Sequence, residues 1–339
     1  MISGLSWANK LLAGPKAHAD PPPPHHHGKR FRNPAGPAGR GLMQQLKWAV
    51  SRRRKPWPKQ LANPPWEPPP RHLSPGTIAA TFINQSTFLL QVDGLNLLTD
   101  PVYSERVGPW NLGGPRRVRP PGVPLEALPP IHCVLLSHNH YDHLDLPTLK
   151  RLSRLWAPLI ITGLRNSALL SRHGLQRVIE LDWWQTHWVS PSLQVTYVPA
   201  QHFSCRSLHD RDRALWGGFL AEASRRRIYF AGDTGYAAHF KEIGRRFGPI
   251  DLALMPIGAY QPRWFMHKAH MNPDEAVRAH LDVRARLSLA MHFGTFRITD
   301  EGIDDPIHAL DLARRAHGVA PEQFRVPEFG QTILVPASG

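Results

Sequence analysis

The chain has 339 residues, 42% of them hydrophobic, which is enough for one large folded domain with an extension. Its two cysteines exclude a disulfide-stapled scaffold, and no stretch reaches the ~18 apolar residues of a membrane span. The formal net charge is +15, but residues 1–75 alone hold 13 Lys+Arg against 2 Asp+Glu. The basic character therefore belongs to an N-terminal arm and not to the rest of the chain.

Residues 1–75 also hold 15 of the 35 prolines, so we predict a basic, Pro-rich, partly disordered arm before one large folded domain over 76–339. A signal peptide is not expected, because Asn9 and Lys10 interrupt the short apolar stretch near the N-terminus. The His25–His27 run beside four prolines is typical of an incidental tract more than of a metal site. The arm's charge is compatible with an anionic membrane, with nucleic acid, or with a solvated tail.

One part of the arm predicts a helix. Apolar residues recur at helical spacing, and the basic run 52–55 follows at once. The apolar positions are Leu42, Met43, Leu46, Ala49 and Val50. We expect this stripe to pack on the main domain, with a position on a membrane surface as the alternative.

From Thr77 the sequence mixes strands with helices and shows no internal repeat. The expected strands are 77–92, 95–99, 131–137, 159–162, 178–181, 194–199, 228–231, 252–256, 287–291 and 332–335. The expected helices are 146–155, 240–247, 272–281 and 306–316, the third capped by Asn272 with acidic residues in its first turn.

The residues that point most directly to chemistry follow a short apolar strand, in the segment Ser-His-Asn-His-Tyr-Asp-His at 137–143. Alternate side chains of an extended loop point the same way, so His138 and His140 can converge on one metal ion. Asp142 and His143 can turn toward a second ion. Imidazole and carboxylate groups are good zinc ligands, and four of them so close together favour a metal site over structural roles.

Three further candidate ligands each lie just beyond a predicted strand. His202 follows 194–199, Asp233 lies in a Gly-Asp-Thr-Gly turn after 228–231, and His292 ends 287–291. Each residue alone could be structural. Together with the first cluster they form a coherent set for two metal ions.

This ligand order resembles the metallo-β-lactamase superfamily. Further segments resemble its N-acyl-phosphatidylethanolamine-hydrolysing phospholipase D-like branch, with weaker similarity at 31–34 in the arm. These segments are 98–101, 114–117, 128–131, 137–145, 180–184, 230–236, 256–266 and 292–296. The resemblance implies an αβ/βα sandwich, in which two mixed β-sheets pack face to face with helices outside.

By position, the resemblance implies how seven residues hold two Zn²⁺ ions, although other divalent metals are compatible with the same ligands. His138, His140 and His202 hold one ion, Asp142, His143 and His292 hold the other, and Asp233 bridges both. A metal-bound hydroxide would attack the substrate, which gives Asp142 and Asp233 catalytic roles. The metal centre alone does not select a phosphodiester over a lactone or lactam.

Other residues are candidates for contacts with the substrate. His270 matches a family histidine near the head group, so we expect a polar contact or a proton carrier there. Tyr141 can line the mouth of the site, and Arg206 and Arg263 can meet a phosphate. Each also has a structural alternative: Tyr141 can pack under the metal loop, and the arginines can form ion pairs.

The resemblance implies a zinc-dependent phosphodiesterase that cleaves N-acyl-phosphatidylethanolamine-like phospholipids to N-acylethanolamine and phosphatidic acid. The chain departs from the family pattern at two places: Gln85 stands where a histidine is common, and a basic residue found near Cys205 in the family is missing. These departures leave a lactonase or a soluble-phosphodiester hydrolase as the alternative function. A membrane- or nucleic-acid-binding module with a structural metal is the third reading, although charge confined to the arm disfavours nucleic acid. We expect a cytoplasmic protein in peripheral contact with a membrane, and a homodimer remains open.

Overall fold

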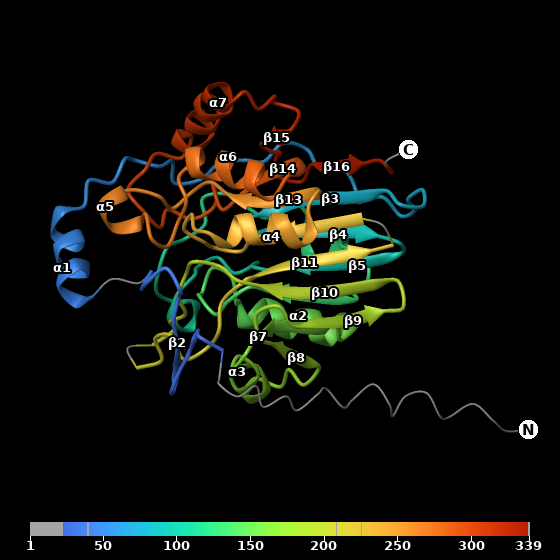
Figure 1. The fold of residues 1–339 in the computed structure, drawn as a ribbon, viewed down its shortest axis with the longest axis horizontal. Helices are drawn as coiled ribbons and strands as arrows, with labels where there is room; N and C mark the ends of the chain where they lie inside the picture. The colour runs from blue at the N-terminus through green and yellow to red at the C-terminus, as the bar shows by residue number, and fades with distance from the viewer. Residues whose placement is uncertain (1–22, 39–40, 208, 225, 338–339) are drawn as a thin grey trace, which may run out of the picture.

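The computed structural model describes residues 23–38, 41–207, 209–224 and 226–337. Its two seven-stranded sheets pack face to face, and helices cover their outer sides (Figure 1). The predicted αβ/βα sandwich is confirmed. A separate two-stranded ladder, β1 (His26–His27) with β2 (Arg30–Phe31), lies in the arm.

The first sheet has the order β16-β3-β4-β5-β6-β7-β8. Its strands are β3 (Ile78–Asn84), β4 (Thr87–Val92), β5 (Leu95–Thr99), β6 (Cys133–Leu136), β7 (Leu159–Gly163), β8 (Val178–Leu181) and β16 (Thr332–Val335). Pairing is antiparallel from β16 to β5 and parallel from β5 to β8. Strand β6 is buried on both faces: Cys133 and Leu135 join the core between the sheets, and Val134 and Leu136 pack toward the helices.

The second sheet has the order β15-β14-β13-β12-β11-β10-β9. Its strands are β9 (Thr186–Ser190), β10 (Leu193–Val198), β11 (Gly218–Ala223), β12 (Arg226–Phe230), β13 (Ile250–Pro256), β14 (Ala285–Met291) and β15 (Phe324–Arg325). Strands β10, β12 and β14 run in the same direction, so their carboxyl ends lie at one edge of the sandwich. That edge carries the candidate site.

Seven α-helices are present in the described residues. They are α1 (Leu42–Ser51), α2 (Leu146–Trp156), α3 (Ser167–Arg172), α4 (His239–Phe247), α5 (Arg263–Met266), α6 (Pro273–Asp282) and α7 (Asp305–His317). The predicted cap of α6 is confirmed, because Asn272 Oδ1 accepts from the Glu275 N–H and the Glu275 carboxylate accepts from the Asn272 N–H. No helix of the described residues has both the length and the hydropathy to cross a membrane.

The expected strand over 77–92 is two strands, because Gln85 takes a left-handed φ of 42° and reverses the chain between β3 and β4. Strands β1, β2, β9, β11 and β15 and helices α3 and α5 were not predicted from the sequence. Strand β11 begins at Gly218, where a Cβ would lie 2.5 Å from the Phe230 carbonyl oxygen, so this close strand pairing requires glycine.

The described part of the arm packs on the domain. His25 and His26 each donate from Nε2 to the Asp182 carboxylate, at 2.6 and 2.9 Å. The side chain of Trp48 on α1 stacks on Phe265 of α5, and these two helices lie together at the left of Figure 1 although far apart in sequence. The arm is therefore a structural part of the domain over these residues, and the His run contributes to that packing.

The expected packing of α1 through its apolar stripe is wrong. Met43 and Val50 are 82% and 88% exposed, and Leu46 is also exposed. The helix instead turns Trp48 toward the domain, because the indole can stack on Phe265 and donate to Asp300 at the same time. The side chain of Leu42 lies outside the described residues.

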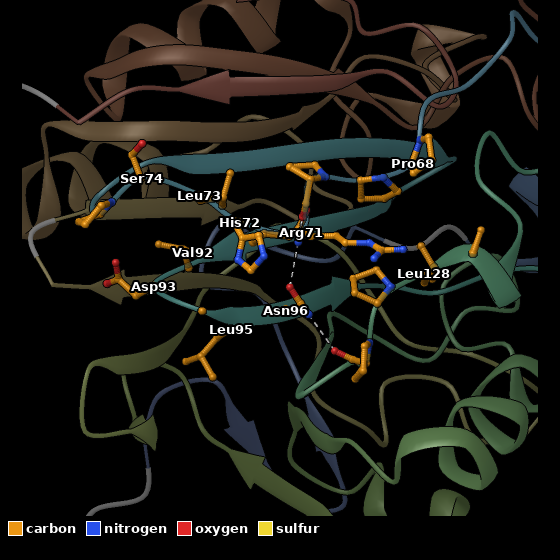
Figure 2. Close-up of a pocket in the computed structure, with 18 residues that line it drawn as sticks. Pro68, Arg71, His72, Leu73, Ser74, Val92, Asp93, Leu95, Asn96 and Leu128 are labelled. Carbon is orange, nitrogen blue, oxygen red and sulfur yellow. Dashed lines mark hydrogen bonds between the residues drawn. The ribbon is translucent and has the colours of Figure 1, made fainter.

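A hollow beside the β4–β5 turn shows how the Pro-rich segment before β3 is held (Figure 2). Gln91 donates from Nε2 to the Pro70 carbonyl and to Asn96 Oδ1, and Asn96 donates to the Pro130 carbonyl. None of the predicted metal ligands lines this hollow. It anchors chain segments and is not part of the candidate site.

Candidate metal centre

All seven predicted ligands meet at one edge of the sandwich. The loop between β6 and α2 supplies four of them, and the segments that follow β10, β12 and β14 supply the other three. They are His138, His140, Asp142, His143, His202, Asp233 and His292. The strand ends therefore bring together residues up to 154 positions apart in the chain.

Three histidines form the first group of ligand atoms. His140 Nδ1 lies 2.9 Å from His138 Nε2 and 3.2 Å from His202 Nε2. All three side chains turn a ring nitrogen toward one point, as a shared metal ion requires.

The second group consists of Asp142, His143, Asp233 and His292. Asp142 Oδ2 lies 3.4 Å from His143 Nε2 and 3.3 Å from His292 Nε2. Asp233 Oδ2 lies 3.2 Å from the same two nitrogens and 3.8 Å from His202 Nε2 in the first group. Asp233 thus stands between the groups, which is the position that the resemblance implies for a bridging ligand.

Glycine allows Asp233 to reach the metal loop. The preceding residue, Gly232, has φ +61°, and a Cβ there would lie 2.8 Å from both the Gly217 carbonyl oxygen and the Ser137 Cβ. Any other residue would push the Asp233 turn away from the loop after β6.

Neighbouring polar groups orient the ligands. His143 donates from Nδ1 to Asp100 at 2.6 Å, and Ser137 accepts from His138 Nδ1 at 2.9 Å. Gln85 donates from Nε2 to Asp142 Oδ2 at 3.0 Å, and its carbonyl accepts from the His292 N–H. The Gln85 departure therefore keeps a hydrogen bond to a ligand, and such contacts fix ring and carboxylate orientation.

The arm supplies a positioning residue that the sequence did not single out. The buried Asn33 amide donates to the His202 carbonyl at 2.7 Å and accepts from the His202 N–H at 3.3 Å. Trp216 Nε1 donates to the same Asn33 oxygen at 3.0 Å. The only sequence signal was the weak family similarity at 31–34, which said nothing about a contact with a ligand.

Burial and mutual charge set the protonation of the cluster. Burial, reinforced by the neighbouring histidines, holds the pKa of His138 and of His140 well below the usual value. Burial opposes the charge on Asp233, but His143 and His292 outweigh it and hold its pKa well below normal. For His292 burial lowers the pKa, yet Asp233 and Asp142 raise it to about 9. Without a metal ion, the cluster thus combines neutral imidazoles at His138 and His140 with a protonated imidazole at His292 and ionised carboxylates.

The donor set fits metal ions. His143 Nε2, His292 Nδ1 and Asp233 Oδ1 are buried and have no hydrogen-bond partner among the described residues. Unpaired buried polar atoms are costly in a folded protein, and a cation held by this cluster would give a partner to such an atom, as at His143 Nε2. The cluster is therefore a metal site by its chemistry.

A cavity of about 490 Å³ opens onto the ligands. His140, Asp142, Asp233 and His292 lie at its base. Its remaining wall is mostly apolar and includes Trp48, Ala49, Phe203, Phe265, Met266, Ala269 and Ile298, with the guanidinium groups of Arg52 and Arg211 at its side. The arm helix α1 therefore forms part of the wall above the metal ligands.

Two of the four expected substrate contacts line this cavity, namely Tyr141 and His270. His270 is buried, its Nδ1 has no hydrogen-bond partner among the described residues, and burial lowers its pKa to about 3. Arg206 is outside the cavity lining: it stacks on Tyr141 and donates to the Asn139 and Leu144 carbonyls. Arg263 pairs with Glu275 and donates to the His270 carbonyl, which is the structural alternative.

Sequence comparisons agree with this geometry. The family model described as "Beta-lactamase superfamily domain" matches residues 95–293. An uncharacterized protein of Mycobacterium tuberculosis is 43% identical over 261 residues, covering 76% of this chain and 68% of its own length. The N-acyl-phosphatidylethanolamine-hydrolyzing phospholipase D 1 of Caenorhabditis elegans is 41% identical over 227 residues, which is 64% of each chain. A mitochondrial Saccharomyces cerevisiae enzyme of that name is 35% identical, and this chain covers 55% of it.

Solved structures share the fold at lower identity. The metallo hydrolase Igni18 of Ignicoccus hospitalis superposes with a TM-score of 0.59 at 23% identity, over 76% of this chain and 98% of that one. An isothiocyanate hydrolase from Delia radicum gut bacteria gives 0.60 at 21%, over 75% and 98%. With its paired sheets, its metal-ligand cluster and the matching family model, the chain belongs to the metallo-β-lactamase superfamily as a metal-dependent hydrolase.

Proposed function

We propose that this protein is a phospholipase D-type phosphodiesterase that hydrolyses N-acyl-phosphatidylethanolamine-like lipids with two zinc ions. The observation that carries the proposal is the apolar cavity directly above the metal ligands, because such a wall suits the acyl chain of a lipid and the ligands face its phosphodiester. The relatives in worm and yeast, which carry that activity in their names, support the substrate class.

In this proposal, seven residues hold the metal ions and two contact the substrate. His138, His140 and His202 would hold one zinc ion and Asp142, His143 and His292 the other, with Asp233 common to both. Bound there, the ions would supply Lewis acidity at the phosphate and a nucleophile from water near neutral pH. Tyr141 and His270 would contact the head group from the cavity wall, and the aromatic side would exclude water from the acyl chain.

The test is a mass-spectrometric product assay. Purified protein with zinc is given N-acyl-phosphatidylethanolamine in mixed micelles, beside His292→Ala and a control, His317→Ala, whose half-buried side chain pairs with Asp274 away from the metal ligands. We expect N-acylethanolamine and phosphatidic acid from the wild type and the control, and no product from His292→Ala.

Two other outcomes of this assay would contradict the proposed substrate. No product from protein that retains bound metal would refute the lipid substrate, and lactones and soluble phosphodiesters would be tested next. Metal-loaded protein that turns over none of these substrates would favour the binding-module reading. The expected cytoplasmic location, with peripheral membrane contact, remains a prediction.

A further inference from the structure

A second hollow, which we term the basic groove, lies beside the metal loop and has a volume of about 1350 Å³. Its lining combines helices α2 and α3, the segment after β10 and one residue of the arm. Eight cationic side chains line it, namely Lys29, Lys150, Arg151, Arg154, Arg165, Arg172, Arg206 and Arg213, against one carboxylate, Asp210. Cations from four separate segments thus converge on one hollow. All but Lys29 belong to the domain, so the expectation that basic character is confined to the arm is wrong at this surface.

Most of this charge is not neutralised within the protein. Arg151 pairs with Glu126, while Arg165 and Arg206 donate to backbone carbonyls. Within the described ranges, the other five cations have no ion pair or side-chain hydrogen bond. They are Lys29, Lys150, Arg154, Arg172 and Arg213, all exposed. Such uncompensated positive charge around one hollow favours the binding of an anionic ligand with several negative groups.

Large apolar side chains lie among these cations. Trp110 lines the groove and is 90% exposed, and Leu112 beside it is 82% exposed. Leu155, next to Arg154 on α2, is 52% exposed. Exposed tryptophan and leucine beside lysine and arginine are typical of surfaces that enter the head-group region of a membrane.

The groove adjoins the metal cavity. Tyr141 lines both hollows, and Arg206, which lines the groove, stacks on its ring at 3.9 Å from the ring centroid. Helix α1 lines the cavity through Trp48 and exposes Met43 and Val50 to solvent. The cavity is therefore flanked by a cationic groove and by a helix with an exposed apolar face.

We propose that the basic groove binds the phosphate groups of anionic phospholipids at a bilayer surface and holds the mouth of the metal cavity against that surface. A bilayer fits better than nucleic acid because Trp110, Leu112 and the exposed face of α1 would enter its interface. The inference goes beyond the proposed function, since binding at the groove requires no turnover and is independent of which ester is cleaved.

The experiment is flotation of the full chain with phosphatidylcholine vesicles, with and without about one third phosphatidylglycerol. The test variant is Lys150→Gln with Arg154→Gln. Each basic residue near an anionic surface contributes a similar amount to the free energy of binding. Removing two of them should therefore lower the affinity for the anionic vesicles roughly 30-fold. Affinity should also fall with rising salt, and Trp110→Ala should weaken binding to the anionic vesicles.

The matched control is Arg71→Gln with Lys241→Gln, which removes the same charge from two exposed residues that do not line the groove. It should bind the anionic vesicles within about twofold of the wild type, apart from a small long-range effect. Equal losses in both variants would show a general charge effect and overturn the proposal. The proposal would also be overturned if the wild type bound a duplex oligonucleotide more tightly than the vesicles and the Lys150/Arg154 variant lost that binding. Circular dichroism checks that each variant is folded.

Discussion

Asp233 and His140 hold central positions among the predicted metal ligands. Asp233 Oδ2 lies within 3.8 Å of nitrogens from both ligand groups, and His140 Nδ1 lies between the other two histidines of its group. Neither carries a packing role comparable to a core residue. We expect their contribution to be to metal binding and not to the hydrophobic core.

We therefore expect Asp233→Asn and His140→Ala each to abolish turnover, a loss of at least about 10³-fold, in a folded protein. Activity assays with circular dichroism and metal analysis check this. Near-normal rates in either variant would show that the ligand assignment is incorrect.

The protonation of the second ligand group makes metal binding sensitive to pH. In the metal-free chain, Asp233 and Asp142 raise the pKa of His292 to about 9, so its imidazole carries a proton at neutral pH. A metal ion must displace that proton, and the raised pKa means that affinity increases as pH rises toward about 9.

Calorimetric titration of the metal-free protein with zinc, at pH 7 in two buffers of different ionisation enthalpy, measures the protons released. Asp233 and Asp142 also hold the pKa of His143 well above its usual value against the opposing effect of burial, so we expect about two protons per protein, and about one fewer in His292→Ala. Identical enthalpies in both buffers would contradict this protonation state.

At the scale of elements, the arm segment around Asn33 acts as part of the active-site frame. Its amide holds both backbone polar groups of His202, and the His25 and His26 pairs with Asp182 fix the same segment to the domain. This dependence links the N-terminal arm to a ligand that lies at the end of β10.

Asn33→Ala should cost roughly 1–3 kcal/mol of stability, because it leaves buried backbone groups of His202 and Trp216 Nε1 with fewer partners. It should also lower zinc affinity about 10- to 100-fold, as loss of a group that orients a ligand does. Chemical denaturation and competition with a chelator measure both.

Asn63→Ala is the control, since it removes another arm hydrogen bond, to the Pro120 carbonyl, that contacts no ligand. Equal zinc affinity in the two variants would contradict a positioning role for Asn33.

Elements with strong local patterns could be predicted from the sequence, whereas features that depend on tertiary contacts could not. Buried apolar strands such as β6 and the capped α6 were predictable because their patterns are local. The face that α1 buries was not, because one indole stacking on Phe265 outweighs three apolar residues in the stripe. At the site, ligands followed from the motif and strand ends, whereas Arg263 has a partner twelve residues away that its sequence context did not reveal.

At the scale of the whole molecule, strand ends of the two sheets meet at one edge, which carries both the predicted metal ligands and the cavity beside them. The first sheet supplies four ligands after β6, and the second supplies three after β10, β12 and β14. Neither sheet alone completes the cluster. The sandwich therefore has to form before the seven predicted ligands can come together.

The most direct measurement is anomalous scattering at the zinc edge from crystals of the zinc-loaded protein. We predict two peaks: one among His138, His140 and His202, and one among Asp142, His143 and His292, with Asp233 between them. A single peak, or peaks away from these side chains, would contradict the two-metal centre.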